Sequence, residues 1–332
     1  MGQSKATDMA VDSTGASYIV GYNSDGLRTS TTGKILKYDS AGVLTNNLTV
    51  SPVSTDKTYL QAIEIDGSNR IYIAGNCENH PAAVPTVHST YLSRLDRATM
   101  TFLWEQVETI SGVADYEPTL DTDVAVDTLG RPVASYGYSD LGTSSYDVCV
   151  RKKTATAGAL VWNQLVTGGS FSGESGLIVD SADDVLVGGA NRLFGTNTRD
   201  GVRLAKVAGA TGTVTWNTLF PYSVISGAPT STSGGGGGTC LMELSTGNYM
   251  SVCNFASGTS RRAGGCVFTA AGAYVSGQGF LTSPTLATSV VPNATGGYFM
   301  GASESGAGAT LYPRQFFFTS TTSLPTWSIA TP

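Results

Sequence analysis

The stretch Asp123-Val-Ala-Val-Asp-Thr-Leu-Gly-Arg-Pro-Val-Ala-Ser-Tyr136 has the pattern of two strands joined by a tight turn. Apolar and polar residues alternate on both sides of Asp127-Thr-Leu-Gly130, and a period of two is typical of half-buried strands. Aspartate accepts backbone hydrogen bonds at the start of such a turn, and glycine supplies the positive φ at its end. The stretch therefore predicts a β-hairpin.

The same hairpin unit recurs at intervals of roughly 50–60 residues, the period of propeller blades. Its first and last turn residues are Asp12 and Gly15, Asp66 and Asn69, Asp127 and Gly130, Asp180 and Asp183, Leu244 and Gly247 and, in a decayed copy, Pro292 and Thr295. The pattern predicts two more strands after each hairpin. The fourth strands carry the four tryptophans of the chain at one repeat position: Trp104, Trp162, Trp216 and Trp327. We expect these side chains to pack between neighbouring blades rather than to stack on sugars.

We therefore predict an all-β chain that forms one domain, a β-propeller of six four-stranded blades. The expected blades cover approximately residues 6–54, 55–118, 119–172, 173–235, 236–284 and 285–332. The expected structural residues are the tryptophans together with the turn residues Asp12, Gly15, Asp66, Asp127, Gly130 and Asp180.

Two stretches carry a resemblance to a known family. Asp147-Val-Cys-Val-Arg-Lys-Lys-Thr-Ala-Thr-Ala-Gly-Ala-Leu-Val-Trp162 and the corresponding residues 200–216 resemble the bacterial β-propeller repeat. The likeness covers nearly the whole chain and is strongest in the first four copies. It implies a propeller and an extracellular or surface location, and it transfers no catalytic residue. Propellers of that family often have seven blades, so seven is the alternative to six.

The composition argues against several kinds of partner. Charged residues make up 13% of the 332 residues, and the formal net charge is −6. A nucleic-acid partner would require clustered Lys and Arg. No apolar run approaches the roughly 18–20 residues that span a bilayer. Because Met1-Gly-Gln-Ser-Lys5 lacks the apolar core of a signal peptide, either the chain reaches its destination by assembly from the cytosol or a leader has been removed.

Two groups of residues are candidates for a site. The only histidines, His80 and His88, follow Cys77 and Glu78 in one predicted loop, but their spacing fits no standard zinc pattern. Asp8 and Asp123 share one repeat position, four residues before the turn aspartate, on the strand expected to line a central channel. They are candidates for a cation site or a paired-carboxylate site. We expect no catalytic residue and no cofactor.

Five cysteines leave at least one without a disulfide partner. Cys240 and Cys253 flank the fifth turn and would face each other across a two-residue loop. The three-residue loop that is usual for Asp-x-x-Gly turns would shift them by one position, and we favour that arrangement. No disulfide framework is expected.

Long loops predict an interaction face. Residues 76–91, 108–122 and 220–239 make the longest connections, and all lie on the face opposite the short turns. Our leading hypothesis is a non-enzymatic structural or receptor-binding component of a phage virion or tail. Other subunits, a surface glycan or a receptor would bind the long-loop face. The alternatives are a carbohydrate-binding or adhesive surface propeller and, second, a polysaccharide hydrolase or lyase.

Overall fold

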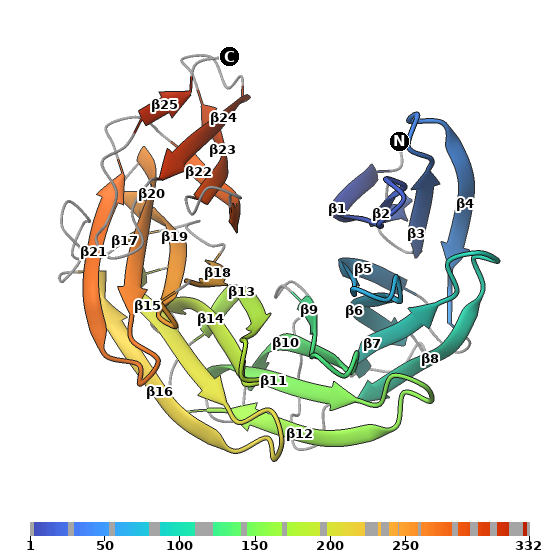
Figure 1. Ribbon diagram of the computed structural model, residues 1–332, viewed down its shortest axis with the longest axis horizontal. Helices are drawn as coiled ribbons and strands as arrows, with labels where there is room; N and C mark the ends of the chain where they lie inside the picture. The colour runs from blue at the N-terminus through green and yellow to red at the C-terminus, as the bar shows by residue number, and fades with distance from the viewer. Residues whose placement is uncertain are drawn as a thin grey trace. The chain divides into compact units, whose positions relative to one another are not determined.

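A computed structural model of the chain describes residues 3–25, 30–52, 57–79, 87–109, 122–140, 145–167, 171–192, 198–222, 232–233, 239–244, 246–257, 260–280, 285–292, 298–305, 311–318 and 328–330. The regular elements in these ranges are the β-strands β1 to β25 (Figure 1). The chain divides into two compact units, Met1–Ser144 with Val148–Leu165, and Ser145–Asp147 with Val166–Pro332. A single domain with the six blade boundaries given above stays a prediction.

The first unit contains three antiparallel meanders, in which each strand pairs with the next along the chain. The first meander is β1 (Gln3–Val11), β2 (Ser17–Ser24), β3 (Thr31–Tyr38) and β4 (Leu44–Val50). The second is β5 (Lys57–Ile65), β6 (Ile71–Asn79), β7 (Val87–Leu95) and β8 (Phe102–Thr109). The third, almost wholly in this unit, is β9 (Thr122–Val126), β10 (Pro132–Asp140), β11 (Ser145–Lys153) and β12 (Leu160–Val166).

The second unit repeats the arrangement. Its first meander is β13 (Phe171–Val179), β14 (Val185–Arg192), β15 (Thr198–Val207) and β16 (Val214–Pro221), with β17 (Thr232–Ser233) added beside β15. Its next meander is β18 (Thr239–Glu243), β19 (Tyr249–Ser257), β20 (Ser260–Phe268) and β21 (Tyr274–Phe280). Its last is β22 (Thr285–Pro292), β23 (Tyr298–Ser305), β24 (Leu311–Phe318) and β25 (Ser328–Ala330). The described strands therefore form six meanders.

The hairpin turns have the geometry that their sequences predict. In the third meander, the Gly130 N–H donates to the carbonyl oxygen of Asp127 over 2.8 Å, and the Gly130 φ is +72°. Asn69 and Asp183, at the same turn position, have φ values of 58° and 63°, which asparagine and aspartate tolerate better than other side chains do. The decayed copy at residue 295 lies outside the described residues.

A bulge interrupts the first strand of each of the first two meanders. The register of β1 with β2 shifts between Ala6 and Asp8, and that of β5 with β6 shifts between Leu60 and Ala62. Glycine faces the bulge each time, and a Cβ on Gly75 would lie 2.1 Å from the Tyr59 carbonyl oxygen. Such bulges re-aim the side chains that follow them.

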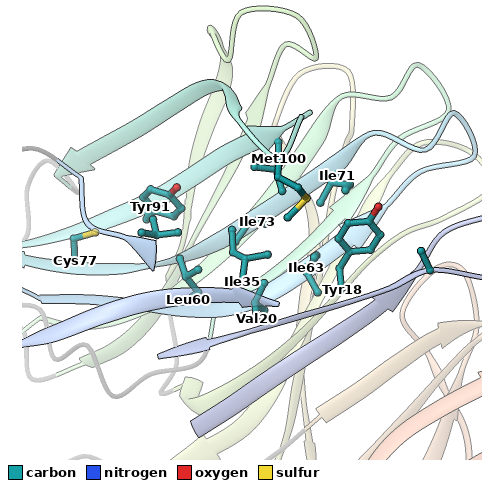
Figure 2. Packing of buried hydrophobic residues seen from close by; sticks show 13 residues of the cluster. Tyr18, Val20, Ile35, Leu60, Ile63, Ile71, Ile73, Cys77, Tyr91 and Met100 are labelled. Carbon is teal, nitrogen blue, oxygen red and sulfur yellow. The ribbon is translucent and has the colours of Figure 1, made fainter. Parts of the chain in front are cut away.

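The cores lie between neighbouring meanders. Leu60 and Ile63 of β5 pack with Val20 and Ile35 of the first meander, all nearly or fully buried (Figure 2). A second cluster joins the second and third meanders and includes Ala62, Tyr72, Val124 and Ala134. In the second unit, Leu186 and Leu204 of one meander pack with Leu241 and Phe268 of the next. Each fully buried aliphatic side chain contributes about 1.5–3 kcal/mol to such a core.

The structure also bears on the expectations about the cysteines, membrane spans and long loops. Cys240 pairs with Val252, and Cys253 pairs with Thr239, so the two cysteines are not opposite each other, as the three-residue loop predicts. Among the described residues, no helix has both the length and the apolarity required to cross a membrane. Residues 80–86, 110–121, 223–231 and 234–238 of the long loops lie outside the described residues, and the interaction face stays a prediction.

Candidate active site

Three carboxyl groups come from the first strands of the first three meanders. Asp8 lies on β1, Glu64 on β5 and Asp123 on β9. Within the first unit, β5 contacts both β1 and β9, so the strand that carries Glu64 lies between the other two. The topology thus brings together acids that are 56 and 59 residues apart in the sequence.

The carboxylate of Asp8 connects β1 to β5. One carboxylate oxygen accepts a hydrogen bond from the Ile63 N–H over 2.9 Å, and the other accepts from the Met9 N–H over 2.8 Å. The bulged Thr7 adds a hydroxyl bond of 2.8 Å to the Leu60 carbonyl oxygen. Burial raises the pKa of Asp8 in spite of the hydrogen bonds to its carboxylate. Asp8 therefore has a structural contact as well as a charge beside Glu64.

Glu64 is the acid with the most altered ionisation in this group. Burial, followed by the negative charges of Asp123, Asp8 and Asp66, raises its pKa to about 7. Among the described residues, no donor forms a hydrogen bond with the Glu64 carboxyl that would stabilise its ionised form. A glutamic acid in such surroundings carries its proton near neutral pH and can act as a general acid.

Asp123 completes the group on the other side of Glu64. One of its carboxylate oxygens accepts the Val124 N–H over 2.8 Å. Asp123 is paired with Ser135 in the ladder between β9 and β10. Of the charges that raise the pKa of Glu64, that of Asp123 has the largest effect.

The turn aspartates next to the group are structural. One carboxylate oxygen of Asp127 accepts the Arg131 backbone N–H, and the other contacts the Lys152 ammonium at 2.8 Å and the Arg131 guanidinium at 2.6 Å. Burial would raise the pKa of Asp127, but the bonds from Lys152 and Arg131 outweigh it and lower that pKa. Asp66 binds Arg70 in the same way. These cations are therefore paired with turn aspartates.

The tryptophans pack on the turn of the following meander. The Trp104 indole N–H donates to the Ala155 carbonyl oxygen over 3.2 Å, and that of Trp216 donates to the Ala270 carbonyl oxygen over 3.1 Å. A Cβ on Gly158 would lie 2.8 Å from the Trp104 ring. These two rings thus contact neighbouring meanders rather than a sugar site. Trp162 is buried, and Trp327 lies outside the described residues.

The histidines do not add a described metal site. His80 lies outside the described residues, and His88 is opposite Glu78 in the β6–β7 ladder, without a described side chain. Within the described ranges, no three His, Cys, Asp or Glu side chains form a group that could hold a metal ion.

Glu64 is the site residue that the sequence reasoning missed. It lies two residues before the turn aspartate, whereas Asp8 and Asp123 lie four residues before it. One feature of the sequence distinguishes Glu64: it is an acid at a repeat position where the neighbouring repeats have Ala10 and Ala125.

Comparisons with solved structures show the fold. A protein of unknown function from Dyadobacter fermentans has 10% identity and a TM-score of 0.58, with 95% of this chain and 94% of that chain covered. The Trypanosoma rangeli sialidase has 9% identity and a TM-score of 0.51, covering 95% and 54%. An endo-arabinase from Bacteroides thetaiotaomicron has 12% identity and a TM-score of 0.46, covering 99% and 95%. No protein-family model matches the chain, and no curated protein matches its sequence.

The coarse fold prediction is confirmed: the chain is all-β with a β-propeller type of fold. The functional prediction is wrong. The structural neighbours include glycoside hydrolases, and this finding overturns the expected role as a phage virion or tail component.

Proposed function

We propose that the chain is a six-bladed β-propeller enzyme that hydrolyses glycosidic bonds in a polysaccharide, with Glu64 as the proton donor. The observation that carries the proposal is the placement of Glu64 between Asp8 and Asp123 on adjacent strands, with its pKa raised to about 7. Glycoside hydrolysis requires one carboxyl that stays protonated and a second that is ionised. The six described meanders support six blades.

The chemistry assigns a separate role to each carboxyl group. Glu64 transfers its proton to the glycosidic oxygen while the bond from that oxygen to the anomeric carbon breaks, and the leaving sugar departs as an alcohol. Asp123, as a carboxylate, either attacks the anomeric carbon or takes a proton from the attacking water. The separation of the two carboxyl groups decides between these routes. Asp8 keeps a negative charge near Glu64 and holds β1 against β5.

The family resemblance supports a location for such an enzyme. The bacterial β-propeller repeat implies an extracellular or surface location, and polysaccharides are abundant there. We therefore propose that the enzyme belongs to the repeat family and acts outside the cell or on its surface.

A polysaccharide panel tests the activity. The parent protein and Glu64→Gln are incubated with neutral and acidic polysaccharides, and new reducing ends and chain lengths are measured. We expect the parent to shorten at least one polymer, and Glu64→Gln to lose activity at least about a hundredfold because it cannot donate the proton. Glu105→Gln is the matched control, since Glu105 is exposed and contacts Tyr91 away from the acids.

Two results would overturn the proposal. One is a parent protein that binds polysaccharides without shortening any of them, which would favour a carbohydrate-binding propeller. The other is a Glu64→Gln variant that cleaves as fast as the parent, which would remove Glu64 from the chemistry.

A further inference from the structure

Asn76 of β6 is a fully buried amide. Its Nδ2 donates to Gln61 Oε1 over 2.6 Å and to Thr122 Oγ1 over 3.1 Å. A side-chain amide has two N–H donors, so both are used. One side chain of β6 thereby connects a residue of β5 with a residue of β9.

Both acceptors are close in sequence to the proposed catalytic acids. Gln61 is the extra residue of the β5 bulge, where the register shifts between Leu60 and Ala62, and Glu64 follows three residues later. Thr122 directly precedes Asp123 on β9. The amide therefore bridges the two strands that present Glu64 and Asp123.

Two of the six repeats have an amide at the position of Asn76, and the other four have small or aromatic residues. The glycine that faces the bulge in β5 is Gly75, and Asn76 follows it. Ten residues after the first turn residue, where the second repeat has Asn76, the other repeats have Tyr22, Gly137, Ala190, Asn254 and Ala302. An amide without hydrogen bonds is costly to bury, and this one is buried where β5 and β9 meet. A purely apolar contact between the strands would not require it.

We propose that Asn76 is a positioning residue that holds β9 against β5 and so sets the separation between the Glu64 and Asp123 carboxyl groups. Its part in catalysis rests on the proposed function. The charged groups that act on Glu64 are Asp123, Asp8 and Asp66. Asp8 is fixed separately, through the Ile63 N–H, and Asp66 lies in the turn that follows β5. Loss of the Asn76 bridge therefore weakens mainly the effect of Asp123.

The titration of Glu64 tests this role without any substrate. Carboxyl carbons are labelled with ¹³C, the Glu64 signal is assigned by its absence in Glu64→Gln, and its midpoint is followed by NMR. We expect Asn76→Ala to lower the midpoint by about one pH unit, because the Asp123 charge moves away. Thr122→Val removes only the acceptor on β9 and should lower the midpoint in the same direction. It is also the variant to measure if Asn76→Ala does not fold.

Asn163→Ala is the matched control. Asn163 accepts from Arg151 and Cys149 on a different strand pair of the same unit, so its loss should leave the Glu64 midpoint unchanged. Folded Asn76→Ala and Thr122→Val variants with the parental midpoint would overturn the positioning role.

The kinetic measurement separates this inference from the proposed function. If the parent hydrolyses a polysaccharide, Asn76→Ala should lower kcat about tenfold and leave KM within about twofold, because Asn76 acts through the acids and not on the sugar. A change confined to KM would contradict the role. If the parent hydrolyses nothing, the proposed function fails, and the titration alone decides about Asn76.

Discussion

The carboxylate of Asp8 accepts a hydrogen bond from the Ile63 backbone N–H over 2.9 Å. Ile63 is the residue before Glu64, so a charge on the first meander is fixed beside the proposed proton donor of the second. A neutral hydrogen-bond acceptor in place of Asp8 would be enough to join the two strands. In this chain the same contact also places a negative charge near Glu64 and contributes to its raised pKa.

Replacing Glu64 should stabilise the fold at high pH. The pKa of Glu64 in the folded protein, about 7, is above its value in the unfolded chain. The protonated carboxyl therefore contributes to the free energy of unfolding in full below about pH 4.5, and this contribution is lost as the pH rises through 7. Glu64→Gln avoids the buried charge and should exceed the parent by about 1–3 kcal/mol at pH 9, with little difference at pH 5. Urea unfolding at both pH values measures this. An equal difference at the two values would show that the charge is not the cause.

The contact of Trp104 with the Gly158 turn should be measurable with two alanine variants. Both Gly158 and Gly42 have positive φ, at 64° and 80°, so each substitution costs about 1–2 kcal/mol in backbone strain. A Cβ on Gly158 also meets the Trp104 ring, whereas one on Gly42 meets no described atom within 4 Å. We expect Gly158→Ala to cost about 1–2 kcal/mol more.

The background Trp104→Ala supplies the check on that prediction. In this background most of the difference between the two glycine substitutions should disappear, and only the contact of the new Cβ with Gln106 Nε2 at 3.1 Å remains. A difference that persists in full without the indole ring would mean that contact with the ring is not the cause of the extra cost.

Asp12 should make the fold sensitive to acid. Burial would raise its pKa, but hydrogen bonds from the turn and from Tyr18 outweigh it and lower that pKa to about 2. A depressed folded pKa gives stability that is present above about pH 4 and is lost as the pH falls through 2. Asp12→Asn should therefore be about 2 kcal/mol less stable than the parent at pH 6 and nearly equal to it at pH 2. Denaturant unfolding of both proteins between pH 2 and pH 6 measures this difference. A difference in the free energy of unfolding that does not change with pH would show that the carboxylate charge is not its cause.

Glu108 holds two buried cations of the third meander. Its carboxylate contacts the Lys153 ammonium at 2.5 Å and the Arg151 guanidinium at 3.2 Å, while both cations are almost fully buried. Glu108→Gln leaves these charges without their carboxylate and should destabilise the fold by about 2–4 kcal/mol. Glu105→Gln, the same change on an exposed residue of the same strand, should cost under about 0.5 kcal/mol. Thermal or urea unfolding compares them, and equal costs would contradict the buried network.

The repeat pattern predicted the strands and turns well because both depend on local chemistry. The alternation of apolar and polar residues predicted the strands on both sides of Asp127 and Gly130. The structure has a turn between them, with a positive φ at that glycine. The position of Trp104 on the fourth strand also came from the repeat, and its ring packs on the following meander. Blade number and ring geometry depend on how the meanders combine, which the sequence pattern alone does not determine.

The candidate site was predicted only in part. Asp8 and Asp123 share a repeat position and were found from it, whereas Glu64 lies two positions away and was not. The raised pKa of Glu64 results from burial and from charges on strands that are more than fifty residues apart. One-residue bulges near Asp8 and in β5 also change the faces that side chains occupy. Neither effect follows from spacing along one strand.

The most direct test of the proposed chemistry compares two leaving groups. The sugar released from the polysaccharide panel is prepared as a dinitrophenyl glycoside, whose leaving group needs no proton, and kcat/KM is measured for parent and Glu64→Gln on both substrates. If Glu64 is the proton donor, the variant loses at least about a hundredfold on the polysaccharide and less than about tenfold on the aryl glycoside. Equal losses on the two substrates, or no loss on either, would contradict the assignment of Glu64 as the general acid.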